Sequence, residues 1–491
     1  MLAESKRRES PSKGFLLAQH TLVRPARSAA PGIALAIILT CQLMLMVDAT
    51  VMNVALPRIQ ADLGFSPAGL AWVLNAYTLV FGGLLLLGGR AGDLFGRRRL
   101  FLGGVALFTT ASLLGALADS TGWLLAARIL QGLGAAAAGP STLALITSTF
   151  TDPRARTKAL SVFSGVASAG FAIGLIVGGL LTEWFSWRAV LLINLPFGLA
   201  ILAFARRYIS EPARHPARLD LPGALTATAG TAALVYGFLR AAEAGWSDPA
   251  ALVALVAGAL VLAAFLWIET RTADPLMPLR LFADRDRAAG YLNFFFGPMA
   301  MMSAFFFLTL FLQEIAGYNA LTTGFAFLPL AATLFAVSRL MPRWLPMFGP
   351  KPFAISGTLL MVLGLVWLTR LSAGSTYVPD LLGPMILLGL GCGLAFTPLN
   401  VVIMSTVRPA DAGAAGGVLQ TMQQVGATVG LAVLVTVAGS ASRSTAAAGG
   451  APSEVLVDGM TAAFTMSAAF AVLTVLVALS FRRLPSRSSA G

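Results

Sequence analysis

Fourteen long apolar stretches, separated by short polar segments, dominate this chain of 491 residues. They lie near residues 32–56, 70–89, 100–118, 123–147, 160–182, 189–206, 221–239, 249–268, 290–313, 321–341, 352–370, 380–404, 413–438 and 461–481. A helix that crosses a bilayer needs about 20 mostly apolar residues, so each stretch suffices for one span. Apolar residues make up 57% of the chain and charged residues only 11%, too few to cover water-soluble domains. The sequence therefore predicts an all-α polytopic membrane protein with 14 transmembrane helices.

The basic residues are distributed unevenly between the loops on the two sides. Of the 34 Lys and Arg residues, 28 fall in the two tails and in alternate loops, five fall in the intervening loops, and Arg128 lies inside a span. Lys and Arg concentrate on the cytoplasmic side of membrane proteins. Both termini are therefore expected on the cytoplasmic side of the plasma membrane. The net charge of +13 is expected to contact water and anionic lipid rather than nucleic acid.

The spans divide into two groups of six. Pro- and charge-rich segments before span 7 and after span 8 isolate these two spans from their neighbours. Repeated halves around a site near the midplane are the usual plan of secondary transporters. The expected organisation is a cytoplasmic tail (1–30), a first six-helix bundle (31–208), a linker with a two-helix insert (209–288), a second six-helix bundle (289–482) and a second cytoplasmic tail (483–491).

The loop after span 2 carries the most specific pattern. It reads Gly-Arg-Ala-Gly-Asp-Leu-Phe-Gly-Arg-Arg-Arg over residues 89–99. Glycines let two helix ends approach closely, and an acid among arginines can form ion pairs and meet the positive end of a neighbouring helix. The loop resembles the signature loop of the major facilitator superfamily, matched in spacing by Gly89, Asp93, Gly96, Arg97 and Arg98. We interpret it as a cytoplasmic gate; the alternative is a basic loop that only fixes the topology.

Other stretches narrow the resemblance to the fourteen-span drug:proton antiporters of that superfamily. They are residues 47–57, 128–132, 186–188, 194–198, 274–279 and 317–318. The resemblance implies a major facilitator fold and efflux of drugs or antibiotics by alternating access. It also implies a monomer that needs no cofactor and uses a proton gradient as its energy source.

Span 5 carries a glycine pattern similar to the antiport motif of those transporters. Gly170, Gly174, Gly178 and Gly179 match it, and small residues allow helices to pack backbone to backbone. Leu175 stands where the motif has a proline, which would bend the helix. This departure keeps open a proton-linked importer or facilitator as the alternative function.

Ionisable residues inside spans are rare and mark functional sites. Asp48 lies in span 1 and Arg128 in span 4, both about 10 Å below the outer boundary at ~1.5 Å per helical residue. We predict that they meet, with Asp48 as the proton carrier, Arg128 as its modulator and Gln131 on the same helix face as Arg128. The alternative is a static ion pair that holds two helices together.

Further polar and aromatic residues are candidates for a substrate cavity. They are Asn53, Phe305, Asn400 and Gln424, together with Gln131. Helix packing is the alternative role for Phe305, Asn400 and Gln424.

These observations predict a proton-coupled exporter of amphipathic organic compounds. No glycine-rich loop ending in Gly-Lys-Ser/Thr is present, so an ion gradient must drive transport. An integral membrane enzyme is a remote alternative, because the chain has no Asp-Asp-x-x-Asp motif and its two histidines are far apart in sequence, which also predicts no metal site. Only four lysines accompany the many arginines, which is typical of a bacterial GC-rich genome.

Overall fold

The computed structural model of the protein describes residues 31–212, 219–405, 407 and 412–481. Within these ranges the chain is helical and contains no strand. The predicted tails, 1–30 and 483–491, lie outside the described residues.

The helices follow the predicted order of spans. The first bundle comprises α1 (Pro31–Leu63), α2 (Ala71–Phe95), α3 (Arg97–Ala116), α4 (Thr121–Thr149), α5 (Pro153–Trp184), α6 (Trp187–Leu192) and α7 (Asn194–Tyr208), of which α6 and α7 together occupy span 6. The insert is α8 (Leu221–Ala244) and α9 (Pro249–Arg271), followed by the short 3-10 helix η1 (Leu279–Phe282). The second bundle comprises α10 (Arg285–Leu310) with its π-helical extension η2 (Phe311–Ile315), α11 (Ala320–Ala326), α12 (Leu328–Phe348), α13 (Pro350–Leu368), η3 (Tyr377–Leu382), α14 (Gly383–Ser405), α15 (Ala412–Ala447) and α16 (Pro452–Leu479).

Twelve of these segments are long and apolar enough to cross a membrane, counted over the described residues. The helices in spans 5 and 7, α5 and α8, are not among the twelve. In α5 the stretch from Ala172 to Trp184 is a shorter apolar helix. Helix α8 is rich in Gly, Thr and Ala, which lowers its hydropathy. The all-helical membrane architecture is confirmed, whereas the count of 14 spans stays a prediction.

Several helices begin at an acidic or amide side chain that caps the first turn. The backbone N–H groups of a first turn have no partner within the helix, and a side-chain oxygen at the N-cap accepts from them. The caps are Asp152, Asp220, Asp248, Asp284 and Asn319. These boundaries are local properties of the sequence.

The helices extend beyond the apolar stretches that predicted them. Helix α1 continues seven residues past Leu56, through Pro57, to Leu63. Asp48 therefore lies near the middle of a 33-residue helix rather than near the outer end of a short one.

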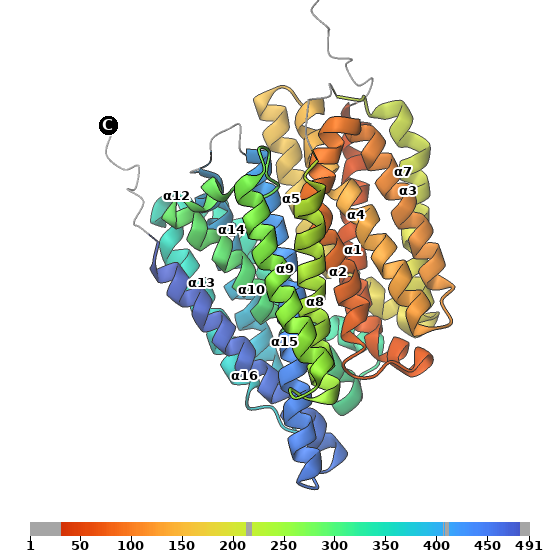
Figure 1. The fold of residues 1–491 in the computed structure, drawn as a ribbon, viewed down its shortest axis with the longest axis vertical. Helices are drawn as coiled ribbons and strands as arrows, with labels where there is room; N and C mark the ends of the chain where they lie inside the picture. The colour runs from red at the N-terminus through yellow and green to blue at the C-terminus, as the bar shows by residue number, and fades with distance from the viewer. Residues whose placement is uncertain (1–30, 213–218, 406, 408–411, 482–491) are drawn as a thin grey trace, which may run out of the picture.

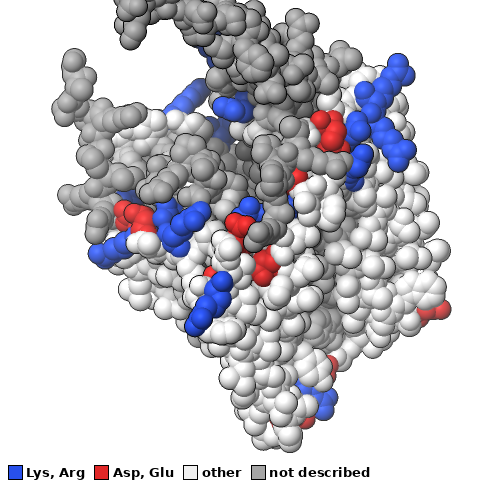
Figure 2. Space-filling model, turned by 45° about the horizontal axis from the view of Figure 1, so that its top comes forward, with Lys and Arg blue, Asp and Glu red and all other residues white. Residues whose placement is uncertain are grey.

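The two bundles lie side by side, with the insert against the junction between them (Figure 1). Helix α8 contacts α9, α2 of the first bundle and α15 of the second. Helix α1 begins and α16 ends at the same end of the molecule, which we call the terminal end; the turn between α15 and α16 projects at the opposite, hairpin end (Figure 1). In Figure 2 the terminal end is turned toward the viewer, and most of the visible Lys and Arg side chains surround it.

The apolar core differs between the two ends. At the hairpin end a single cluster contains buried side chains of both bundles, such as Val51 and Leu175 from the first and Phe311 and Leu330 from the second. At the terminal end each bundle has its own cluster. The bundles are thus joined at the hairpin end and have separate cores at the terminal end.

Candidate functional site

The predicted charge pair forms in the interior of the first bundle. Arg128 of α4 donates from Nη1 to Oδ2 of Asp48 on α1 at 2.8 Å. The Asp48 side chain is 0% exposed and that of Arg128 is 1% exposed. The structure therefore brings Asp48 and Arg128 together, as predicted.

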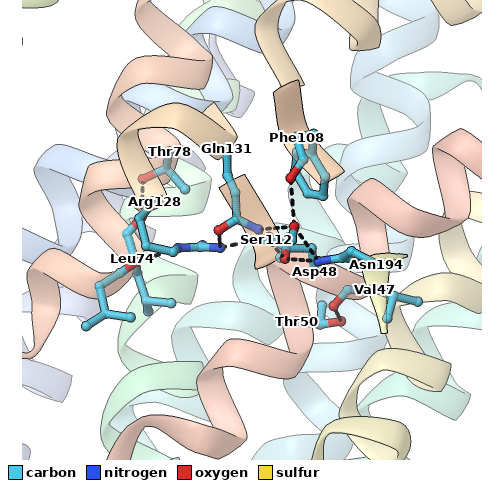
Figure 3. Close-up of polar contacts among 12 residues, drawn as sticks. Val47, Asp48, Thr50, Leu74, Thr78, Phe108, Ser112, Arg128, Gln131 and Asn194 are labelled. Atoms are coloured by element: carbon cyan, nitrogen blue, oxygen red, sulfur yellow. Dashed lines mark hydrogen bonds and ion pairs between the residues drawn. The ribbon is translucent and has the colours of Figure 1, made fainter. Parts of the chain in front are cut away.

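The second carboxylate oxygen of Asp48 is held by two amides (Figure 3). Oδ1 accepts from Nδ2 of Asn194 at 2.8 Å and from Nε2 of Gln131 at 3.1 Å. The same two amides also donate to Oγ of Ser112, at 3.2 and 2.9 Å, and Ser112 donates to the carbonyl of Phe108. Helices α1, α3, α4 and α7 thus each supply a side chain to one buried network.

Arg128 has further partners besides Asp48. Its Nε donates to the carbonyl of Val73 on α2 at 2.9 Å, and Nη1 donates to Oε1 of Gln131 at 3.0 Å. Its guanidinium lies 4.5 Å from the centre of the Tyr77 ring, an attractive cation–π arrangement. A buried charge is tolerated when its hydrogen-bonding groups have partners, and these contacts supply partners for Nε and Nη1 of Arg128.

Sequence reasoning found Asp48, Arg128 and Gln131 but missed Ser112 and Asn194. Asn194 lies in one of the stretches that carried the family resemblance, and Ser112 lies in the apolar span 3. Both are fully buried polar residues. A polar side chain inside an otherwise apolar stretch was the available signal, but many such residues bond only to their own helix.

The cluster predicted as a cytoplasmic gate lies at the junction of α2 and α3. Asp93 of α2 and Arg97 of α3 form an ion pair at 2.5 Å across this junction. Gly96 separates the two helices with a φ of 109°, a backbone conformation that favours glycine. The close helix approach expected at Gly89 occurs at Gly88, where a Cβ would lie 2.0 Å from the carbonyl oxygen of Ala136.

A glutamate outside the signature loop caps α3. Oε1 of Glu211 accepts from the backbone N–H of Arg98 at 3.0 Å, and Oε2 accepts from that of Arg99 at 3.2 Å. The Arg98 side chain donates to the carbonyl of Ile209 at 3.0 Å and lies 3.8 Å from Glu211. Glu211 lies after α7, more than 100 positions along the chain, so the loop pattern alone gave no indication of it.

The glycine face of α5 packs against both bundles. A Cβ on Gly174 or Gly178 would collide with Thr50 or Val51 of α1, and Gly170 also faces α1. A Cβ on Gly179 would lie 2.6 Å from the carbonyl oxygen of Ala320 on α11. Leu175 is buried in the shared core, and its carbonyl lies against Gly324 of α11. The small-residue face predicted for span 5 is thus a contact surface, partly between the bundles.

The other cavity candidates do not converge on one point. Asn53 is buried and donates to the carbonyl of Ala49 on its own helix, and its Oδ1 has no hydrogen-bond partner among the described residues. Phe305 stacks on Phe327, with ring centres 5.9 Å apart, and Asn400 is exposed. Gln424 lies against Gly82 of α2, at the seam between the bundles. In the described part of the chain no group of three or more His, Cys, Asp and Glu side chains is arranged to hold a metal ion.

The family follows from comparison with known proteins. The model of the Major Facilitator Superfamily matches residues 38–431. The chain belongs to the major facilitator superfamily. This confirms the family inferred from the signature loop.

Relatives and solved structures agree with this assignment. The chain is 42% identical to the cephamycin export protein CmcT of Amycolatopsis lactamdurans, over 85% of this chain and 87% of that protein. It is also 42% identical to the puromycin resistance protein pur8 of Streptomyces alboniger, over 93% and 92% of the two chains. The crystal structure of the POT family transporter PepTSo matches with a TM-score of 0.67 at 14% identity, over 91% of this chain and 98% of that one. That last likeness shows the fold alone.

Proposed function

We propose that this facilitator exports amphipathic organic compounds, such as antibiotics, in exchange for protons. Relatives with 42% identity over most of both chains are named for cephamycin export and puromycin resistance, which supports efflux. The fully buried Asp48–Arg128 pair is the observation that supports proton coupling. As a transporter, and not an enzyme, the protein needs no cofactor beyond the ion gradient, and we propose that it works as a monomer.

The proposed location is the plasma membrane of a bacterium, with both termini in the cytoplasm. The 28 basic residues in the tails and alternate loops, against five in the others, support this orientation. The terminal end is then cytoplasmic, and the structure corresponds to a state closed toward the outside. Substrate enters between the separate terminal-end cores, and the bundles then close there and open at the hairpin end.

The network around Asp48 suits a proton carrier. A proton arriving on Oδ2 takes the place of the Arg128 hydrogen bond, while Oδ1 still accepts from Gln131 and Asn194. Arg128 in turn keeps the carbonyl of Val73 and Oε1 of Gln131. The ion pair can therefore open without leaving either side chain devoid of partners. Release of the pair between α1 and α4 is the step that we assign to coupling.

The test is transport in proteoliposomes with ethidium as the probe and a pH gradient as the driving force. Asp48→Asn preserves size and removes the titratable proton, so it should abolish uphill ethidium transport and leave downhill exchange measurable. The matched control is Asp62→Asn, because Asp62 also pairs with an arginine, Arg188 at 2.6 Å, but is 47% exposed. The control should transport uphill as the wild type does.

Two outcomes would overturn parts of this proposal. If the Asp48→Asn protein still moves protons with ethidium, Asp48 is a static structural pair and the carrier lies elsewhere. If the wild-type protein accumulates ethidium along an inward proton flux rather than expelling it, the protein is an importer, the alternative that the leucine in span 5 keeps open.

A further inference from the structure

Two acidic side chains meet at the base of the insert, at the terminal end. Asp220 caps α8 and Glu269 lies in the last turn of α9; they are 5% and 3% exposed. Each uses one oxygen to accept from backbone: Oδ1 of Asp220 from Gly223 at 2.8 Å, and Oε2 of Glu269 from Met277 at 2.9 Å. Oδ2 of Asp220 and Oε1 of Glu269 are buried and have no hydrogen-bond partner among the described residues.

The two free oxygens border the same position, that of Gly223. A Cβ on Gly223 would lie 2.5 Å from Oδ2 of Asp220 and 2.9 Å from Oε1 of Glu269. Only a glycine leaves space for both carboxyl groups at this position. Two buried carboxylates that face each other cannot both stay ionised, because like charges repel strongly where water is excluded.

In the described part of the chain, the other charged groups on the surrounding elements do not neutralise the pair. They are Arg90 and Asp93 on α2, Arg97 at the start of α3, Arg271 on α9, Asp274, Arg280 and Asp284 in the connecting segment, and Arg285, Asp286 and Arg287 on α10. Within the described residues neither Asp220 nor Glu269 forms an ion pair with any of them. Helix α15 carries no charged side chain between Ala412 and Arg443.

We propose that Asp220 and Glu269 share one proton between Oδ2 and Oε1, which makes the base of the insert a second protonation site. One carboxylic acid donates to the other carboxylate, so both free oxygens are satisfied and the pair carries a single negative charge. The site is separate from Asp48 and does not depend on the proposed export.

The position of the pair connects it with both bundles. Helix α8 begins at Asp220 and packs along α2, where Thr228 lies against Gly83, and along α15, where Thr436 donates to the carbonyl of Phe238 at 2.6 Å. Loss of the shared proton adds a charge at the base of a helix that contacts both bundles. The insert is thereby assigned a proton-binding role.

The direct test is the infrared absorption of protonated carboxyl groups in the purified full-length protein, in lipid nanodiscs at neutral pH. The wild type and the matched control Asp48→Asn should both show a protonated carboxyl band that is missing from Glu269→Gln and from Asp220→Asn. An identical band in wild type and Glu269→Gln, or no band in the wild type, would overturn the proposal, whatever the transport assays show.

A second measurement guards against misfolding of the variants. The side-chain amide introduced by Glu269→Gln can donate to Asp220 in place of the shared proton, so this variant should fold. The unfolded chain releases the proton of a glutamic acid above about pH 4.3, whereas the folded wild type is proposed to keep it. The stability of the wild type should therefore fall as the pH rises. This fall should be absent from Glu269→Gln, which has no shared proton to lose. Thermal unfolding between pH 5 and 8 should therefore show the Tm of the wild type dropping relative to that of the variant. Parallel curves would contradict a shared proton.

Discussion

At the scale of single residues, the chain places a full ion pair where water is excluded. Removing a carboxylate and a guanidinium from water costs several kcal/mol each, and the gain must come from well-aligned partners. Asp48 has three donors, and Arg128 has the carboxylate, a carbonyl, an amide oxygen and an aromatic face. The pair is stable only as part of this network, so each member depends on the others.

Removing one partner of the pair should therefore be severe. Arg128→Ala leaves an uncompensated buried carboxylate and should destabilise the protein by about 3–5 kcal/mol. Adding Asp48→Asn to Arg128→Ala removes that charge and should restore part of the loss. The measurement is thermal or denaturant unfolding of purified protein in detergent. Arg58→Ala is the control, because Arg58 lies 3.9 Å from Glu183 and is 60% exposed, so it should change stability by less than about 1 kcal/mol. If the effects of the two substitutions on stability were strictly additive, Asp48 and Arg128 would not depend on each other.

At the scale of helices, glycine positions decide how closely α5 approaches its neighbours. Gly174 and Gly178 bring α5 against α1 within the first bundle, whereas Gly179 brings it against α11 of the second. Because the neighbour of Gly179 is backbone, it cannot rotate away as a flexible side chain would. This contact joins the two bundles at the hairpin end.

A side chain at Gly179 should disturb that contact. Gly179→Val is expected to shift the protein away from the state closed at the hairpin end and to reduce export at least tenfold without loss of folded protein. Gly165→Val is the matched control, since a Cβ on Gly165 of the same helix meets no atom within 4 Å. Labelling of a cysteine introduced at Gln313, which bonds to the carbonyl of Val54, reports the opening. Equal labelling in the two valine variants would rule out this role of Gly179.

The cap of α3 is a second property at this scale. Glu211 accepts from two successive N–H groups, and Glu211→Gln leaves one carboxamide oxygen for both, with the charge removed. Loss of a helix cap lowers the stability of the helix by about 0.5–2 kcal/mol. Hydrogen exchange at the amides of Arg98 and Arg99 should therefore accelerate roughly 2- to 30-fold. Asp248→Asn, at the cap of α9, should leave these amides unchanged. Unaltered exchange in Glu211→Gln would show that α3 does not rely on this cap.

At the scale of the whole molecule, the core is continuous at one end and divided at the other. Apolar side chains of both bundles share one cluster at the hairpin end, and each bundle keeps its own cluster at the terminal end. Such an arrangement allows one bundle to rotate against the other, because only the apolar contacts within the shared cluster must break for the bundles to move. Between the bundles, α2 and α15 also lie side by side, and Thr428 donates to Thr78 at 2.8 Å across this seam.

A covalent link between α2 and α15 across that seam should stop the bundles from moving against each other during transport. In a protein whose native cysteines are replaced by serine, Thr78→Cys with Thr428→Cys should lose transport on cross-linking and regain it on reduction. The control joins Thr445 of α15 and Asp458 of α16, whose side-chain oxygens are 2.8 Å apart within one bundle. Cross-linking of Thr445→Cys with Asp458→Cys should leave transport intact. Full transport by the cross-linked Thr78/Thr428 pair would mean that the bundles do not move at this seam.

The helices and the family could be predicted from sequence because both depend on local features. In a bilayer each helix must satisfy its own backbone groups, so a long apolar stretch is enough to indicate a helix. The signature loop and the glycine pattern of span 5 are also contiguous in sequence. Asp48 and Arg128 could be paired in advance because charges inside spans are few and need partners.

The remaining features were decided by packing between distant segments. Asn194 reaches Asp48 from 146 positions away, Glu211 caps α3 from beyond α7, and Asp220 meets Glu269 only where α8 and α9 close their hairpin. When another helix supplies the capping or bridging partner, no sequence pattern indicates which residue that partner is. The contact depends on how the two helices are rotated and shifted relative to each other. The sequence by itself determined which segments are helices and which charges had to be paired; the tertiary structure decided which partners they found, because those partners meet only when the bundle is packed.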